Sequence, residues 1–236
     1  RKFYRKKIKK KSSIIVYAEK EKIQNLLNYD SVNKLLLQKN INAPRLLSEN
    51  FNQNLIEIDD LGTKTILDIL KKKNTNKLKI YKKILVILIK LQKIKLKKIK
   101  NFKKKFYKIP IYSNKLIFNE ANLFLDWYIP KVINKNKKFK IKRKLKKIIT
   151  SLIKKIQLPN TTFVHRDFHV SNLMIKKNKI SIIDSQDAVY GNVVYDLASL
   201  IDDVRLKTSK NIKEMIYQSY LNLNKKKINK IKFKND

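Results

Sequence analysis

Apolar positions along the chain follow two patterns, and the two patterns dominate different parts of it. In the first part, short apolar runs bounded by polar turns predict strands around a single helix, with a break in that helix near Tyr29 and Asp30. The predicted strands cover residues 3–8, 13–18 and 54–58, and the helix covers residues 23–37. Residues 42–47 predict a turn that leads into another strand. A sheet-forming unit is therefore expected near the start of the chain.

Beyond residue 65, apolar residues recur mainly every three or four positions, which predicts helices. The expected helices cover residues 65–70, 80–99, 119–129 and 144–156. The second of these is the longest and is expected to pack in the core, and residues 101–117 are expected to form a loop. A further helix should follow Asp196, whose carboxylate is expected to cap it. Residues 207–236 predict one more helix and a solvated lysine-rich tail.

Residues 163–187, FVHRDFHVSNLMIKKNKISIIDSQD, hold both histidines of the protein. Two apolar runs flank a polar tip at Asn178, which predicts an antiparallel hairpin. A hairpin centred on Asn178 would place Leu173 opposite Ile183. The polar residues just outside this pair would then converge at the open end of the hairpin.

Those polar residues are Asn172 and Asp184, and Asp167 lies on the loop that leads to the same opening. Carboxylate and amide oxygens suit Mg²⁺, a hard cation that often shares its ligand shell with phosphates. The alternative is that the three side chains only cap turns, which Asp and Asn commonly do. The convergence of all three favours a magnesium site.

The combination His-Arg-Asp at 165–167, then Asn172, then Asp184 after a short hairpin resembles the catalytic segment of kinase-like phosphotransferases. The spacings H-x-D-x-H-x-x-N and I-D-x-x-D-A are similar to those of the aminoglycoside phosphotransferase family. This resemblance implies a two-lobed α+β kinase-like fold that uses ATP and Mg²⁺. It implies that Asp167 is the catalytic base and that Asn172 and Asp184 bind the metal. It also implies that three residues support the catalytic loop structurally: His165, Arg166 and Asp196.

The sequence Asp59-Asp60-Leu61-Gly62 resembles the hinge between the two lobes of this family, where backbone groups bind adenine. Asp60 and Leu61 are accordingly expected to bind the nucleotide, although an ordinary strand-to-helix turn would read similarly. The expected division is an incomplete β-rich nucleotide lobe at 1–58, a hinge at 59–62 and a mainly helical catalytic lobe at 63–236. The family's glycine-rich strand would precede residue 1. Residues 13–18 contain no lysine, so the cation that binds the phosphates is not assigned.

Two further stretches resemble bacterial amino-sugar kinases of cell-wall recycling within the same family. One is E-x-x-x-F-x-D-W at residues 120–127, and the other runs from I-D-x-Q-D-A to an arginine at position 205. This resemblance implies an acceptor such as N-acetylmuramate or N-acetylglucosamine, phosphorylated at the anomeric hydroxyl. The candidate acceptor contacts are Glu120, Trp127, Gln186, Asp187 and Arg205. Plain core packing of Trp127 and an exposed position of Arg205 are the competing interpretations.

The formal charge of +40 changes this picture little. The 58 basic residues are mostly lysines spread through every segment, which favours a solvated surface over a specific nucleic-acid site. The absence of cysteine excludes disulfides, and the apolar run at 84–89 is too short to span a bilayer. No signal peptide is recognised at the start, so a cytoplasmic monomer is expected. Both glycines, Gly62 and Gly191, are expected where a side chain is hard to accommodate.

Two rival functions remain open at this point. The first keeps the chemistry but changes the acceptor to an aminoglycoside, choline or another alcohol, although a strongly basic protein matches cationic acceptors poorly. The second is a pseudokinase or a basic nucleic-acid-binding protein, which the unassigned phosphate cation favours. The intact set of Asp167, Asn172 and Asp184 argues against this second rival.

Overall fold

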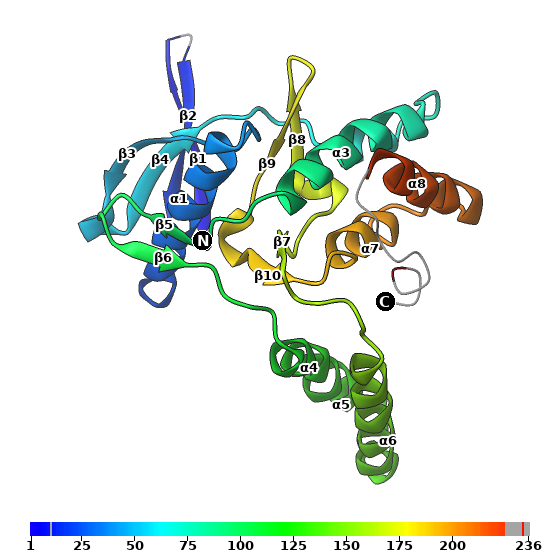
Figure 1. The fold of residues 1–236 in the computed structure, drawn as a ribbon. Helices are drawn as coiled ribbons and strands as arrows, with labels where there is room; N and C mark the ends of the chain where they lie inside the picture. Colours follow the sequence, from blue (N-terminus) through cyan, green and yellow to red (C-terminus); the bar gives the residue numbers. More distant parts are fainter. Residues whose placement is uncertain (10, 225–232, 234–236) are drawn as a thin grey trace.

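The computed structural model describes residues 1–9, 11–224 and 233, and its fold is α+β (Figure 1). The first part is a four-stranded antiparallel sheet in the order β1-β2-β4-β3. Its strands are β1 (Lys2–Ile8), β2 (Lys11–Tyr17), β3 (Leu46–Asn50) and β4 (Leu55–Asp59). One helix, α1 (Ile23–Gln38), packs against this sheet, so the predicted elements of this region are confirmed.

Helix α1 runs without the break expected at Tyr29 and Asp30. Both side chains are buried, and the ring of Tyr29 packs with Val16 of β2 and Ile56 of β4 in the small core of this region. The Asp30 carboxylate accepts a hydrogen bond at 2.8 Å from Nζ of Lys34, one turn further along. Packing and this ion pair stabilise the helix where its sequence alone favours a turn.

The larger core is built by α2 (Ile66–Leu70), α3 (Lys77–Gln92), α7 (Tyr195–Ile201) and α8 (Lys210–Leu223). Residues 32–43 also join this core, so it extends across the boundary predicted at residue 58, and that division stays a prediction. The α3 helix ends at Gln92, not at residue 99. The side-chain amide of Gln92 donates to the carbonyl oxygen of Val193 at 2.9 Å, which ties the helix end to the chain before α7.

The segment after α3 folds into a two-stranded ribbon, β5 (Lys98–Lys100) with β6 (Phe106–Lys108), where a helix end and a loop were expected. Its turn contains Lys104 in the left-handed region, with φ of 59°. The backbone amides of Lys103 and Lys105 donate to the side chain of Asn101, which closes the turn. Short strands with lysines at alternate positions carry too little apolar signal to be recognised from sequence.

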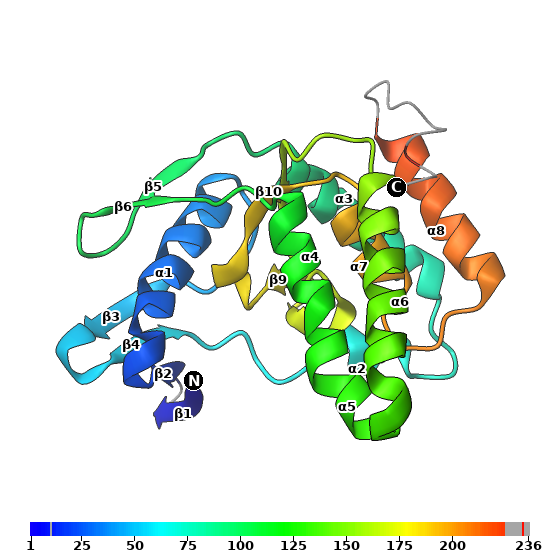
Figure 2. The ribbon, with the colours of Figure 1, turned by 90° about the horizontal axis from the view of Figure 1, so that it is seen from below.

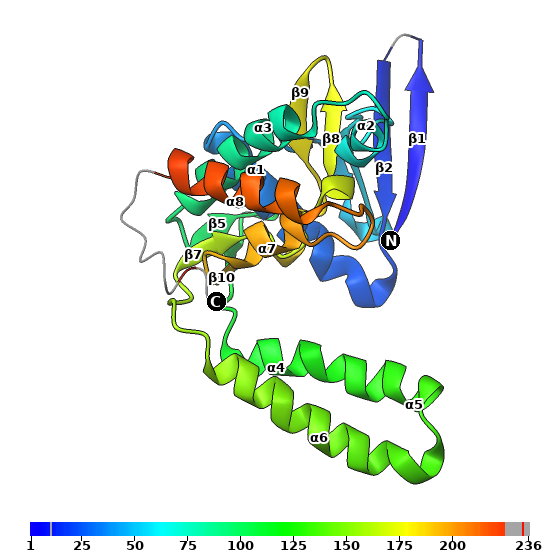
Figure 3. The same ribbon diagram turned by 90° about the vertical axis from the view of Figure 1, so that its right-hand side faces the viewer.

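A helical arm follows, made of α4 (Asn114–Leu123), a π-helical turn (Phe124–Tyr128), α5 (Ile129–Val132) and α6 (Lys135–Lys154). Figure 3 shows that the arm projects from the rest of the molecule, and Figure 2 shows α4 lying beside α6. The α6 helix begins at Lys135, before the predicted start at residue 144, and the helical stretch from α4 to α5 covers residues 114–132 instead of 119–129. Ile153 is the one residue of α6 that is buried. The amphipathic pattern therefore predicted the helix correctly, but it does not mean that the apolar face of the helix is buried.

The hairpin of the catalytic segment consists of β8 (Leu173–Lys176) and β9 (Lys179–Ile182). Leu173 pairs with Ile182, one residue away from the predicted partner Ile183. The turn contains two residues, Lys177 and Asn178, with φ of 48° and 61°, and is not centred on Asn178. Left-handed residues at both central positions match the type I′ turn of two-residue hairpins, and this turn sets the observed register.

Both glycines occupy positions that resist a side chain, as predicted. Gly62 has φ of +90°, which L-residues rarely adopt. A Cβ atom on Gly191 would approach Cγ2 of Val164 to 3.2 Å. Across the described residues, no helix is both long enough and apolar enough to span a bilayer.

Candidate active site

The catalytic loop follows β7 (Thr162–Val164), which pairs with β10 (Val189–Gly191). The carboxylate of Asp196 accepts hydrogen bonds from the backbone amides of His165 at 2.8 Å and of Arg166 at 3.1 Å. Asp196 is therefore not the helix cap that the sequence predicted, because both carboxylate oxygens bind the loop. Asp196 is buried, and burial raises its pKa to about 7 against the lowering effect of the two amides.

His165 lies fully buried beside this support, with its ring edge-on to Phe168 at 6.2 Å between ring centroids. Burial lowers the pKa of His165 to about 4, so its imidazole is neutral at physiological pH. A neutral, fully buried ring is consistent with the structural role predicted for His165.

Arg166 links the catalytic loop to the helical arm. Its backbone is left-handed, with φ of 76°, and its guanidinium pairs with Glu120 of α4. The same guanidinium lies 5.2 Å from the ring centroid of Tyr112, and the hydroxyl of Tyr112 donates to Glu120. The Glu120 carboxylate, a candidate acceptor contact, is thus engaged by two residues of the protein.

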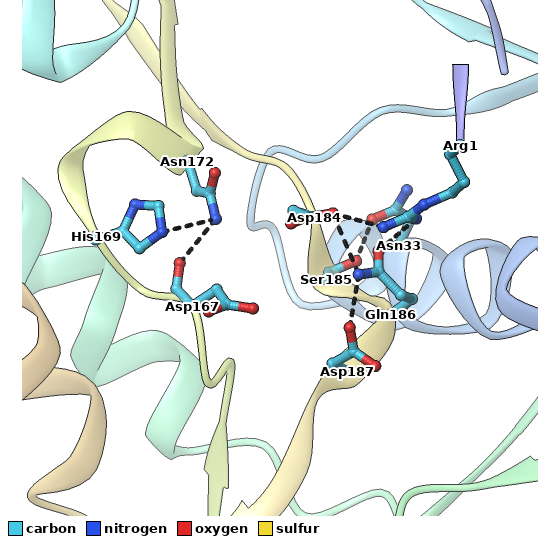
Figure 4. A network of polar contacts seen from close by, with 9 residues as sticks. All are labelled: Arg1, Asn33, Asp167, His169, Asn172, Asp184, Ser185, Gln186 and Asp187. Atoms are coloured by element: carbon cyan, nitrogen blue, oxygen red, sulfur yellow. Dashed lines mark hydrogen bonds and ion pairs between the residues drawn. The ribbon is translucent and has the colours of Figure 1, made fainter. Parts of the chain in front are cut away.

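Asp167 and Asn172 lie beside each other on one side of the opening, and Asp184 lies on the other side (Figure 4). The side-chain nitrogen of Asn172 donates to the backbone carbonyl of Asp167 at 3.1 Å and lies 3.3 Å from Nε2 of His169. Burial and the nearby Asp184 carboxylate raise the pKa of Asp167. Burial and the positive charge of Arg205 lower the pKa of His169.

Asp184 begins the turn after β9 with φ of 64°. Its Oδ1 accepts from Nη2 of Arg1 at 2.9 Å and from the amide of Gln186 at 3.1 Å. The Gln186 amide also donates to Asp187 at 2.8 Å, and Ser185 donates to Asn33 of α1 at 2.7 Å (Figure 4). The turn is therefore fixed by its own side chains and by two residues of the first part of the fold, Arg1 and Asn33.

The donor chemistry of this opening fits a hard divalent cation. Within the described part of the chain, no cluster of three or more His, Cys, Asp or Glu residues could form a metal site by itself. The combination here is one carboxylate, Asp184, with the amide oxygen of Asn172, whose nitrogen is already engaged. Asp184 and Asp187 both raise the pKa of Asp167 by repulsion, and a bound cation would relieve this concentration of negative charge.

Residues 59–62, the predicted hinge, border a cavity of about 350 Å³ that reaches Asn172 and Asp184. Apolar residues line much of it: Phe3, Ile14, Tyr29, Ile58, Leu61 and Met174. The carboxylate of Asp60 accepts from Nε of Arg5 at 2.8 Å, and its carbonyl oxygen accepts from Nζ of Lys176 at 2.7 Å. Asp60 and Leu61 both line this cavity, where the hinge resemblance expects a nucleotide.

A second cavity, of about 550 Å³, lies between the base of the arm and α7. Tyr112, Tyr195 and Arg205 are among the residues that line it, and Arg205 pairs with Asp203 at 3.1 Å. Trp127 is not among its lining residues. The indole is 69% exposed on the arm, so the core packing considered for Trp127 is wrong.

Comparison with known proteins agrees with this geometry. Residues 96–227 match the family model described as "Phosphotransferase enzyme family". The chain belongs to this phosphotransferase family. The match includes Asp167, Asn172 and Asp184 and covers more than half of the chain.

Two curated relatives of this phosphotransferase chain are named N-acetylmuramate/N-acetylglucosamine kinase. The protein from Pseudomonas aeruginosa is 28% identical over 169 residues, which cover 72% of this chain and 47% of the relative. The protein from Neisseria meningitidis serogroup B is 26% identical over 205 residues, which cover 86% of this chain and 58% of the relative. The chain thus spans about half the length of the curated relatives it matches.

Solved structures support the phosphotransferase fold. An aminoglycoside-3'-phosphotransferase of type VIII aligns with a TM-score of 0.66 at 10% identity, covering 99% of this chain and 86% of that one. An ADP-bound aminoglycoside phosphotransferase APH(2'')-Ib aligns with a TM-score of 0.65 at 13% identity, covering 94% and 77%. An ethanolamine kinase from Plasmodium vivax aligns with a TM-score of 0.62 at 19% identity, covering 99% and 66%.

Several residues around this opening and the first cavity could not be predicted from the sequence. Arg1, Arg5 and Lys176 contact Asp184 or Asp60 across long sequence separations, and surface lysines elsewhere look the same in sequence. The alternation Arg1, Phe3, Arg5 was the available signal, because alternate residues of a strand lie on one face. Tyr112 had no local signal, since its contacts come from the arm and the loop together.

Proposed function

We propose that this chain carries the catalytic site of an ATP-dependent small-molecule kinase that phosphorylates a sugar hydroxyl. The observation that carries the proposal is the placement of Asp167, Asn172 and Asp184 around one opening. The hinge cavity reaches two of these residues. The charges of Asp203 and Arg205, which line the second cavity, influence His169 beside them. A nucleotide and an acceptor entering from these two cavities would meet at Asp167.

ATP bound with magnesium would supply the phosphoryl group. Asp184 and the amide oxygen of Asn172 would bind the metal, and Asp167 would orient the acceptor hydroxyl and accept its proton. The raised pKa of Asp167 makes it a better proton acceptor than an ordinary aspartate. Asp196 would position the loop through its two amide contacts.

We further propose N-acetylmuramate or N-acetylglucosamine as the acceptor, phosphorylated at the anomeric hydroxyl. The names of the curated relatives support this choice. The second cavity offers aromatic rings at Tyr112 and Tyr195, which suit the apolar face of a sugar. Arg205 lines the same cavity and would pair with the carboxylate that distinguishes N-acetylmuramate from N-acetylglucosamine.

An ATP-consumption assay against a panel of acceptors tests this proposal. The panel contains N-acetylmuramate, N-acetylglucosamine, an aminoglycoside and choline, with Asp167→Asn as the inactive control. The expected result is turnover on the amino sugars, with a phosphorus NMR signal typical of an anomeric phosphate. Turnover only on the aminoglycoside or choline would overturn the acceptor assignment. Nucleotide binding without turnover on any alcohol would favour the pseudokinase.

A further inference from the structure

The β2 strand, which pairs with β1 and β4 at the centre of the sheet, brings no lysine into the nucleotide cavity. The residues of β2 that pair with both neighbouring strands are Ser13, Ile14, Ile15, Val16 and Tyr17. Phosphate groups at Asp184 would then face an acidic turn that also contains Asp187. A kinase site needs a cation there to offset this charge.

Alternate residues at the start of the chain, on one face of β1, line the cavity or contact residues that line it. Arg1 contacts Asp184 at the metal end, and Arg5 contacts Asp60 at the hinge end. Phe3 lies between them and lines the cavity. These three residues therefore extend from Asp184 at one end of the cavity to Asp60 at the other.

The guanidinium of Arg1 is held in a defined orientation. Nη2 donates to Asp184 at 2.9 Å, and Nη1 donates to the side-chain oxygen of Gln186 at 2.8 Å (Figure 4). The Arg1 side chain is only 15% exposed. This is unusual for an arginine at the end of a strand, because such side chains commonly remain solvated.

We propose that Arg1 is the phosphate-binding cation of this kinase site, supplied by β1 in place of a lysine on β2. The inference rests on the proposed function. The planar fork of Arg1 matches phosphate oxygens in a bidentate manner. Asp184 would exchange its contact with Arg1 for one with the metal, which would free the Arg1 guanidinium to bind the phosphates.

A purely structural ion pair makes a different prediction. If Arg1 only stabilised the turn at Asp184, its loss would lower the free energy of unfolding and would affect every ligand of the cavity alike. A phosphate contact instead affects ligands in proportion to their phosphates. Adenosine, ADP and ATP, which share a base and differ in phosphates, separate these two cases.

The experiment is calorimetric titration of the full chain with adenosine, ADP and ATP in the presence of Mg²⁺. Arg1→Ala and Arg1→Lys are compared with wild type and with Lys2→Ala, a matched control because Lys2 is the exposed neighbour on the other face of the strand. Arg1→Ala should weaken ADP and ATP binding about ten- to a hundredfold and leave adenosine binding unchanged. Arg1→Lys should show a smaller loss, and Lys2→Ala should show none.

Unchanged ADP and ATP affinities in Arg1→Ala would overturn the assignment of Arg1, as would an equal loss for adenosine. Either outcome leaves the proposed function intact, since wild type still binds nucleotide. A wild-type chain that binds none of the three ligands would overturn the proposed function and this inference together. Urea unfolding of the variants serves as the check that they remain folded.

Discussion

The catalytic segment, residues 163–187, and the helical arm both have regular apolar patterns. Most apolar side chains of the segment are buried, whereas many of those on the arm are exposed. In the segment, the apolar side chains are covered: Phe163, Val164, Phe168, Val170 and Leu173 are all buried. On the arm, large apolar side chains face solvent: Leu123, Phe124, Trp127, Tyr128, Val132, Phe139, Ile148 and Leu152. A periodic apolar pattern thus predicts a helix or strand, whereas burial of its apolar side chains depends on which other elements pack against it.

The polar contacts of the two regions also differ: several of those in the segment connect it to other parts of the fold, whereas those of Asp126 on the arm stay within the arm. The loop amides at 165 and 166 are bound by Asp196, and Ser185 binds Asn33 of α1. On the arm, by contrast, Asp126 pairs with Asn122 one turn away and with Lys142 across the helix pair. Substitutions should therefore have large effects in the segment and small ones on the arm.

The largest effect is expected at the centre of the segment. Asp167→Asn should lower turnover by about 10²–10⁴-fold or more, because an amide cannot accept the proton of the attacking hydroxyl. Binding of an ATP analogue should be nearly unchanged. Steady-state rates across a Mg²⁺ series should show no rescue for this variant.

Asn172→Ala is the matched comparison, since excess Mg²⁺ should partly restore its rate if the residue acts through the metal. Near-native turnover in Asp167→Asn would remove the basis for reading residues 163–187 as an active site.

A pair of phenylalanine truncations measures the contrast in stability directly. Phe168→Ala should lower the free energy of unfolding by about 3–5 kcal/mol, because the ring is fully buried in the larger core. Phe139→Ala on α6 should change it by less than about 0.5 kcal/mol, since that ring is 78% exposed. Urea unfolding of both variants provides the comparison. Equal losses would mean that the arm is covered in solution by another surface.

Two buried ionisable groups, His165 in the segment and Asp196 of α7 beside it, should give opposite pH dependences of stability. Between pH 6.5 and 4, unfolding lets His165 bind a proton that the folded state excludes, which costs about 3 kcal/mol of stability as the pH falls. Asp196 has a pKa raised to about 7, so its contribution is lost as the pH rises from about 4 to 7. The two effects oppose each other in wild type.

Replacing one of the two groups with a neutral residue should reveal the pH dependence that is due to the other. Relative to wild type, Asp196→Asn should gain stability with rising pH over this range, and His165→Gln should lose it. Urea unfolding at several pH values measures both slopes. Parallel curves for the two variants and wild type would show that neither group titrates with a shifted pKa.

The smallest effect is expected at Trp127. Because its indole is exposed on the arm and not among the residues that line the second cavity, Trp127→Ala should leave KM for the sugar unchanged within about twofold. Arg205→Ala, at the cavity, should raise KM for N-acetylmuramate more than for N-acetylglucosamine. A large rise in KM for Trp127→Ala would show that the arm closes over the acceptor, and the comparison drawn above would fail.

Much of the fold and the centre of the site could be predicted from sequence. The strands and helices of the first part and the motif around Asp167 depend on local spacing, which sequence shows directly. The hairpin register was missed by one residue because a left-handed lysine at 177 gives no sign in composition. Arg1 was missed because its partner, Asp184, lies at the other end of the chain and surface cations resemble one another.

The backbone turns point to a practical property of this chain. Besides Gly62, positive φ values occur at non-glycine residues throughout the described part, among them Lys9, Asn54 and Lys104. A lysine in this conformation costs roughly 1 kcal/mol that glycine avoids. Lys9→Gly and Lys104→Gly should therefore each raise the free energy of unfolding, which would help crystallisation. At Asp184 the same exchange would relax the backbone but remove the carboxylate that binds Arg1 and Gln186, so this turn cannot be stabilised in that way.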